Sequence, residues 1–369
     1  MRFKQNYTLF KRGKIWYYRC YSPEGIRTSG TSTGLSSKVK AQQFCEQLFQ
    51  DGLLYENKSA KILGPYIEHF YDLNSPYMVD LMATGTEEHP ALADSTIRKL
   101  QSMLATHILP YFEKVRIKDF TPSQIKAFRQ ELLNKELSHK SINNIVSALT
   151  TISKSLINDG VIELDPMAGI KPMKGDSEKV DAFTVPEAKK ILLSQWDNNK
   201  AKIINLISCC TGLRLSECLA IRPETVFPDY IDVRDQQNET ATKLVPIKTK
   251  NMRKVPICSE LYEIIQDALE MDPKFFFVTK NIPYKRLILK LQELDFQEAR
   301  EERNLRFHSW RHLYNTWLLS ENVAPVKVAA VIGHTFKGCN VQMTYTNFKP
   351  EDYKEIYEAQ KKLFNKIFQ

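Results

Sequence analysis

The sequence predicts a multidomain α+β protein with three regions of different character. Residues 1–60 contain short β-prone runs followed by one helical stretch, residues 61–173 have helical patterns, and residues 174–369 combine helices with a few strand signals. At 369 residues the chain is long enough for two or three domains. We expect a small three-stranded sheet with a helix, then a helical domain, then a mainly helical domain with a small antiparallel sheet.

The composition limits the class of protein. The formal net charge is +9, the pI is near 9.0 and 43% of residues are hydrophobic, as in a globular protein. No window approaches the ~18 apolar residues of a membrane span, and the first residues are polar rather than signal-like. The seven cysteines lack the paired spacing of zinc sites. We therefore expect reduced thiols and a cytoplasmic protein with no membrane partner.

In the first region, β-prone runs at 7–10, 15–21 and 26–33 alternate with turn-forming residues, which predicts three antiparallel strands. A helix should follow Ser37. Four of its apolar residues have the spacing of one buried face: Ala41, Phe44, Cys45 and Leu48.

The charge is concentrated in this first region. Residues 1–60 hold ten Lys or Arg against four acidic residues, although they make up only a sixth of the chain. A basic field of this kind binds polyanions by releasing their counterions, and nucleic acid is the commonest polyanion. A charged surface that merely keeps the protein in solution is the alternative interpretation.

Helices in the middle region are indicated by caps and by period. One pattern begins at Asp94, and Thr121 with Pro122 and Gln124 forms an N-terminal cap. A long helix is predicted over 141–159, where apolar residues follow one face until Gly160 ends it. The segment 165–176 is rich in Pro, Gly and charge, which is typical of an interdomain linker.

In the third region Thr184 and Glu187 form a capping box, so a helix should begin there. Strand signals occur at 230–233, 243–247 and 254–257. The last two are joined through the basic segment 248–253, which predicts a hairpin or a loop.

Two of the clusters that could carry chemistry in this region are centred on arginines. Arg214 follows a helix break at Gly212; it could point at an anion or pair with Glu217 three residues on. His308 and Arg311 are three residues apart, so both can lie on one helical face and converge on a phosphate. A surface or capping role is the simpler explanation of such an isolated pair.

The other two clusters follow along the chain. His334 comes directly after Gly333, where an apolar helix should end, and could be only a cap. Tyr345 is one of sixteen tyrosines, and a packing role is its simplest explanation.

Taken together, the order and spacing of the four clusters resemble the tyrosine recombinases of the phage-integrase type. The family pattern is T-G-[LM]-R-x-[SG]-E, a lysine on a β-hairpin, H-x-x-R, G-H-[ST] and a nucleophilic tyrosine. This sequence supplies six residues in that order: Arg214, Lys248, His308, Arg311, His334 and Tyr345. By the same resemblance, residues 1–60 are an arm-type DNA-binding domain, 61–173 a helical, SAM-like core-binding domain and 174–369 the catalytic domain.

The match departs from the pattern at two points. The interval between His334 and Tyr345 is longer than in short family members, with 336–340 as the expected insertion. Lys250 lies two residues from Lys248, and the alignment of the following strand selects Lys248.

The resemblance implies a site-specific recombinase that cleaves and rejoins DNA through a 3′-phosphotyrosyl intermediate. Arginine forks and histidines would bind the phosphate, Lys248 would protonate the leaving oxygen, and neither metal nor other cofactor would be needed. The implied partners are double-stranded DNA, with core and arm sites, and three further copies in a homotetramer. Accessory DNA-bending or excision proteins are left open.

The basic first region favours integration and excision of a mobile element. A type IB topoisomerase-like enzyme and a DNA-binding regulator that lost catalysis are the alternatives. The C-terminal helix, with Ile356, Leu363 and Ile367 at helical spacing, could pack in its own domain or on a neighbouring subunit.

Overall fold

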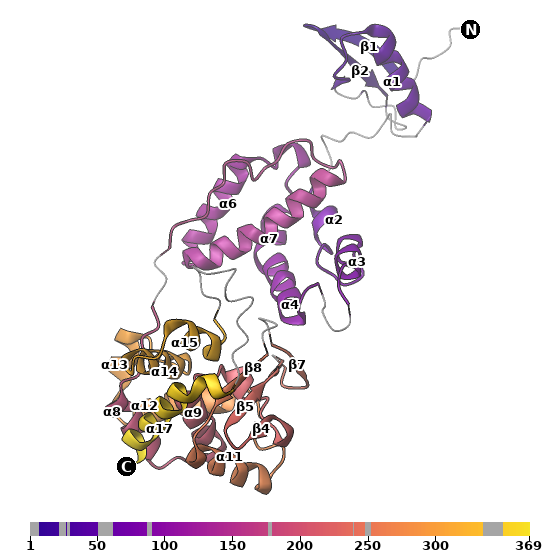
Figure 1. Ribbon diagram of the computed structural model, residues 1–369. Coiled ribbons are helices and arrows are strands. Elements are labelled where there is room, and N and C mark those ends of the chain that lie inside the picture. The colour runs from indigo at the N-terminus through magenta and orange to yellow at the C-terminus, as the bar shows by residue number, and fades with distance from the viewer. Residues whose placement is uncertain are drawn as a thin grey trace, which may run out of the picture. The chain divides into compact units, whose positions relative to one another are not determined.

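The computed structural model describes residues 7–21, 27, 30–50, 62–86, 91–175, 179–238, 240–247, 252–334 and 350–369. The chain separates into two compact units, Met1–Asp176 and Ser177–Gln369 (Figure 1). The boundary lies at the end of the expected linker. The further division of the first unit near residue 60 stays a prediction.

The first unit begins with an antiparallel sheet of order β1-β2-β3, followed by one helix. These elements are β1 (Tyr7–Arg12), β2 (Ile15–Cys20), β3 (Thr31–Ser32) and α1 (Lys38–Gln50). Tyr18 and Cys20 of β2 pack with Cys45 of α1 in a small core of their own. Phe44 was expected on the buried face but is 40% exposed, because it lies at the edge of the apolar stripe and the sheet is narrow.

The described residues of this unit from Ile62 onward are mainly helical. Its helices are α2 (Gly64–Ile67), α3 (Pro76–Ala83), α4 (Asp94–Met103), α5 (Leu109–Phe112), α6 (Pro122–Asn134) and α7 (His139–Asn158), with a 3-10 turn at Ile117–Asp119. A π-helical turn at Leu104–Ile108 joins α4 to α5. Pro110 follows that turn and has no N–H to donate, which explains the local irregularity.

The predicted long helix corresponds to α7, capped by the Ser138 side chain. Gly160 ends it with a φ of +66°, in the left-handed region that glycine favours. The expected apolar face is buried in one core: Ile142, Ile145, Leu149, Ile152 and Leu156.

The second unit is mainly helical around two small sheets. Its helices are α8 (Val185–Leu193), α9 (Asn199–Thr211), α10 (Leu215–Cys218), α11 (Ser259–Met271), α12 (Asn281–Glu293), α13 (Gln297–Arg303), α14 (His308–Ser320), α15 (Pro325–Ile332) and α17 (Lys354–Phe368). Its 3-10 turns are Pro223–Thr225 and Pro350–Tyr353. The capping box of Thr184 and Glu187 begins α8 as predicted. Helix α9 is buried along almost its whole length, and Asn205 on it accepts a 2.8 Å hydrogen bond from the Trp310 indole of α14.

The strands of this unit form an antiparallel sheet of order β4-β5-β8 and a separate pair, β6-β7. They are β4 (Val226–Phe227), β5 (Tyr230–Val233), β6 (Asp235–Gln237), β7 (Leu244–Pro246) and β8 (Arg253–Pro256). The hairpin alternative for the two strands flanking 248–251 is therefore wrong. Each strand pairs instead with an earlier one, β7 with β6 and β8 with β5, and a hydrogen bond from the Asn238 N–H to the Lys243 carbonyl (3.0 Å) continues the β6-β7 pairing.

The C-terminal helix α17 packs within its own unit. Gln360 is fully buried and bridges three elements: its side chain donates to the carbonyls of Cys210 and Pro256 and accepts from the Cys258 N–H. Its apolar residues Ile356, Leu363 and Ile367 are buried as the spacing predicts. In this chain the helix therefore completes the core in cis.

Two further expectations concern the chain as a whole. Within the described ranges, no helix has both the length and the apolar character to cross a membrane. The six cysteines described are buried, and Cys339 lies outside the described residues.

Candidate active site

The site is built around the carboxyl end of α15. Gly333 follows the helix with a φ of +68°. Two of the terminal carbonyls are satisfied by the backbone, since His334 N–H donates to Ala329 (2.9 Å) and Gly333 N–H to Ala330 (3.1 Å). This cap turns the chain so that His334 leaves the helix end near Arg311 and Arg214.

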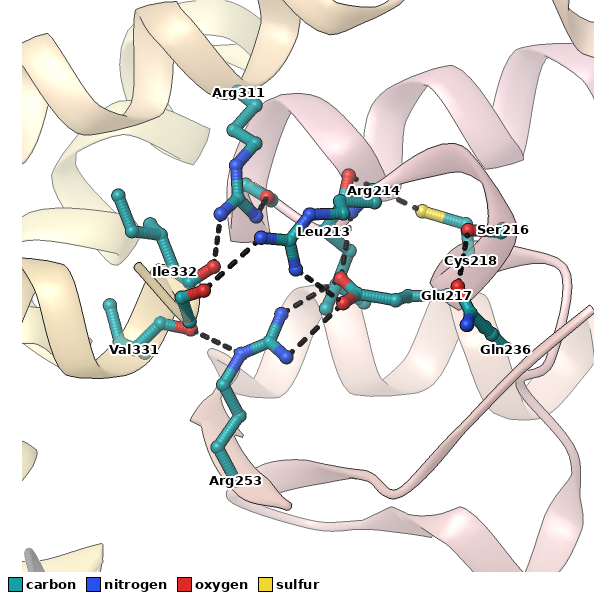
Figure 2. Close-up of polar contacts among 12 residues, drawn as sticks. Leu213, Arg214, Ser216, Glu217, Cys218, Gln236, Arg253, Arg311, Val331 and Ile332 are labelled. Carbon is teal, nitrogen blue, oxygen red and sulfur yellow. Dashed lines mark hydrogen bonds and ion pairs between the residues drawn. The ribbon is translucent and has the colours of Figure 1, made fainter. Parts of the chain in front are cut away.

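The carbonyls of residues 331–333 each accept a hydrogen bond from a different arginine (Figure 2). The pairs are Arg253 Nε to Val331 (2.8 Å), Arg311 Nη2 to Ile332, and Arg214 Nη2 to Gly333 (3.1 Å). Such terminal carbonyls have no partner inside the helix, and the helix dipole favours cations at this end. The carbonyls at the end of α15 therefore hold three guanidinium groups close together.

Glu217 on α10 binds two of these arginines together. It is 3% exposed and accepts from both the N–H (2.9 Å) and Nη1 (2.8 Å) of Arg214. It also accepts from Nη1 (3.2 Å) and Nη2 (2.8 Å) of Arg253. Burial alone would raise the pKa of Glu217, but the charge and hydrogen bonds of Arg253, followed by those of Arg214, hold it below its ordinary value.

Arg214 both pairs with Glu217 and reaches the site, so its two sequence-based interpretations are compatible. It is the N-cap residue of α10 with an extended backbone. Its guanidinium turns away from the unfavourable amino end of that helix and towards the carboxyl end of α15. With 31% of its side chain exposed, it remains open to a ligand.

Arg311 lies deeper, at 1% exposure, on the first turns of α14. Its Nη1 donates to the Gly212 carbonyl at 2.7 Å, and its Nε has no hydrogen-bond partner. Burial and then the neighbouring Arg214 lower the pKa of Arg311 to about 9. A buried cation with an unsatisfied donor indicates a place for an anion.

The two predicted histidines lie in the same positive field. Partial desolvation and the charges of Arg311 and Arg214 lower the pKa of His334 to about 4. Desolvation, His312 and Arg311 lower the pKa of His308 to about 4 as well. Both imidazoles are therefore neutral at physiological pH and can donate or accept one proton.

Four of the six predicted site residues are thus brought together: Arg214, His308, Arg311 and His334. The other two, Lys248 and Tyr345, lie outside the described residues, as does Lys250. The next tyrosine along the chain is Tyr353. Tyr353 is 4% exposed, and burial followed by Asp352 raises its pKa to about 12, so it is poorly suited to act as a nucleophile.

Arg253 was not among the predicted site residues, and Glu217 was predicted only as a partner of Arg214. A signal for Arg253 was present, because Arg253 and Val255 alternate along one strand and share its buried face. An arginine on the inward side of a strand needs a buried carboxylate partner.

Comparison with known proteins agrees with this geometry. The family model described as "Phage integrase family" matches residues 183–351, and "Phage integrase, N-terminal SAM-like domain" matches residues 87–133. The integrase of ICEBs1 from Bacillus subtilis (strain 168) is 24% identical over 271 residues, covering 68% of this chain and 73% of that protein. Tyrosine recombinase XerC from Pseudomonas syringae pv. tomato is 22% identical over 268 residues, covering 68% and 85%.

The chain belongs to the phage integrase family of tyrosine recombinases. These are DNA strand-transferring enzymes, and so is this recombinase. Its fold is similar to that of the Tn1549 transposon integrase in complex with transposon right end DNA, with a TM-score of 0.58, 18% identity, and coverage of 78% of this chain and 97% of that chain. A lambda integrase tetramer bound to a Holliday junction gives a TM-score of 0.57, 15% identity, and coverage of 95% and 99%.

Proposed function

We propose that this recombinase integrates and excises a mobile element, breaking DNA with Tyr345 and holding the scissile phosphate at the end of α15. The observation that carries the proposal is the gathering of Arg214, Arg311, His308 and His334 in one positive field. Attack on a phosphodiester builds negative charge on the non-bridging oxygens, and donors fixed in advance at that position stabilise it.

Arg214 and Arg311 would bind the non-bridging oxygens. Each guanidinium is oriented by carbonyl oxygens, and each has donors left over, Nε of Arg311 among them. Because carbonyl oxygens of the protein hold both guanidinium groups in place, little reorganisation is needed when the charge develops. His308 and His334 would add neutral N–H donors to the same phosphate.

The Tyr345 oxygen would attack phosphorus, forming the 3′-phosphotyrosyl bond while the bond to the 5′ oxygen breaks. A neutral histidine can accept the phenol proton, and Lys248 would give a proton to the leaving 5′ oxygen. The ester conserves the energy of the cleaved bond, so a 5′-hydroxyl from a second duplex can reverse the step and release the tyrosine.

The first unit carries a face of basic and aromatic side chains on β1 and β2. Strand alternation puts Phe10, Arg12, Tyr17 and Arg19 on the face opposite the one that packs on α1. The Arg12 guanidinium carbon lies 5.6 Å from the ring centres of both Phe10 and Tyr17, and that of Arg19 lies 4.5 Å from the ring centre of Phe10. We call these four residues the arm face, and we infer that it binds the phosphates of an arm-type site.

The relatives support the biological setting. One is the integrase of ICEBs1, and the fold is shared with the Tn1549 transposon integrase and with lambda integrase, seen as a tetramer on a Holliday junction. By analogy, four copies of this recombinase would assemble on two DNA sites in the cytoplasm.

Recombination on a supercoiled plasmid tests the proposal. With both ends of the element that carries the gene, the protein should give excised circles and a rejoined backbone, and the Tyr345→Phe variant should give neither. Relaxation without exchange of partners would favour the topoisomerase alternative. DNA binding with neither product would favour a regulator that lost catalysis.

A further inference from the structure

Arg253 makes three hydrogen bonds that join separate parts of the catalytic unit. Its Nε donates to the Val331 carbonyl at the end of α15, and its two terminal nitrogens straddle the Glu217 carboxylate of α10. The residue itself begins β8, two positions after the undescribed segment 248–251. Figure 2 shows the guanidinium between the helix end and the carboxylate.

The contacts need the planar fork of a guanidinium. A lysine has one nitrogen and could not reach both carboxylate oxygens and the helix carbonyl from a fixed plane. The approach to α15 is also close, since a Cβ on Gly333 would lie 3.1 Å from the Arg253 guanidinium carbon. The surroundings of Arg253 are therefore shaped for this side chain, at 8% exposure.

Arg253 also limits how far the Glu217 carboxylate neutralises the charge of Arg214. Two guanidinium groups share one carboxylate, so the three side chains together keep a net positive charge that favours an anionic ligand. If Arg253 were absent, Glu217 would pair with Arg214 alone and cancel its charge. The Arg214 fork would then be free to rotate towards the carboxylate and away from Gly333.

Building on the proposed function, we propose that Arg253 is a positioning residue for DNA cleavage. Through Glu217 it fixes the Arg214 fork, and through the Val331 carbonyl it holds the end of α15 from which His334 projects. It acts through these groups and does not touch the phosphate itself, so its substitution should slow the chemical step more than it weakens DNA binding.

The test uses the full chain and nicked DNA substrates that trap the covalent complex. Single-turnover cleavage at saturating DNA and the Kd for DNA are measured for wild type, Arg253→Gln, Arg253→Lys and Glu217→Gln. We expect both Arg253 variants to cleave about 10-fold to 100-fold more slowly, as displaced catalytic groups do. The Kd should stay within about threefold, because a buried arginine neutralises no phosphate.

Two further variants sharpen the result. Because Arg253 acts through Glu217, the double substitution Arg253→Gln/Glu217→Gln should cost less than the product of the single effects. The matched control is Arg222→Gln. Arg222 likewise contacts two carboxylates, of Glu224 and Asp235, and the Ala220 carbonyl, but none of the site residues, so its cleavage rate should stay near wild type.

Should Arg253→Gln fold poorly, Arg253→Lys carries the test, since it keeps the charge and most of the volume. Wild-type cleavage by Arg253→Lys, an effect confined to Kd, or equal slowing by Arg222→Gln would overturn the inference. Failure of the proposed function looks different, because the wild type itself would then form no covalent complex.

Discussion

Arginines serve different purposes at the end of α15 and on the arm face of β1 and β2. In the catalytic unit, Arg311 and Arg253 are buried and each is aimed by carbonyl or carboxylate oxygens. On the arm face, Arg12 and Arg19 lie at least partly exposed over aromatic rings. Fixed donors favour one geometry of one phosphate, whereas mobile surface cations bind any nearby phosphate.

This difference predicts that substitutions in the two regions affect different measured quantities. Changes in the buried cluster should alter the rate of strand cleavage with little change in affinity. Changes on the arm face should alter affinity and its salt dependence with little change in rate.

The largest effect is expected from Arg311→Lys. Lysine keeps the positive charge but cannot contact both the Gly212 and Ile332 carbonyls and still offer donors to phosphate. Loss of one such fixed donor should slow single-turnover cleavage by about 10²–10³-fold. Arg222→Lys is the matched control, and a weakened Kd with an unchanged rate would contradict the contrast.

A smaller effect is expected from Arg12→Gln combined with Arg19→Gln. Filter binding to arm-type DNA across a salt series should show weaker affinity and a log–log salt slope reduced by about 2, because about two phosphate contacts are lost. Cleavage of a core-only substrate should be unchanged. Lys40→Gln on α1, away from the arm face, is the control; an equal loss there would mean that only net charge matters.

The smallest effect concerns pH. The pKa of His308 is about 4 in the folded chain and near ~6.5 when unfolded, so the unfolded state takes up the proton first as pH falls. This contribution to stability is complete above pH ~6.5 and is lost towards pH ~4. In thermal unfolding without DNA, the Tm of His308→Gln should rise relative to the Tm of wild type as the pH falls from ~6.5 to ~4. Parallel Tm curves would contradict the placement of His308 in the positive field.

Much of the fold was predictable because it depends on local pattern. The apolar period of α7, the capping box of α8 and the glycine after α15 are local patterns, and each predicts a single helix or helix end. The pairing of β8 with β5 rather than β7 was not predictable, because strand partners depend on where the whole chain reverses.

The site divides in the same way. Arg214, Arg311, His308 and His334 carry motif signals, and the structure brings them together. Glu217 pairs with Arg253, 36 positions further along the chain, as well as with its near neighbour Arg214, and no local spacing predicts that second pairing. The burial of Arg253 follows strand alternation, but its partner could be named only from the fold.

The proposed role of this positive field is to serve Tyr345 as the nucleophile. Wild type and Tyr345→Phe are incubated with nicked DNA from the element's ends, in EDTA and without ATP, and denaturing gels report protein covalently bound to DNA. We expect an adduct with wild type alone. An adduct with both proteins, or with neither while both bind the DNA, would contradict it.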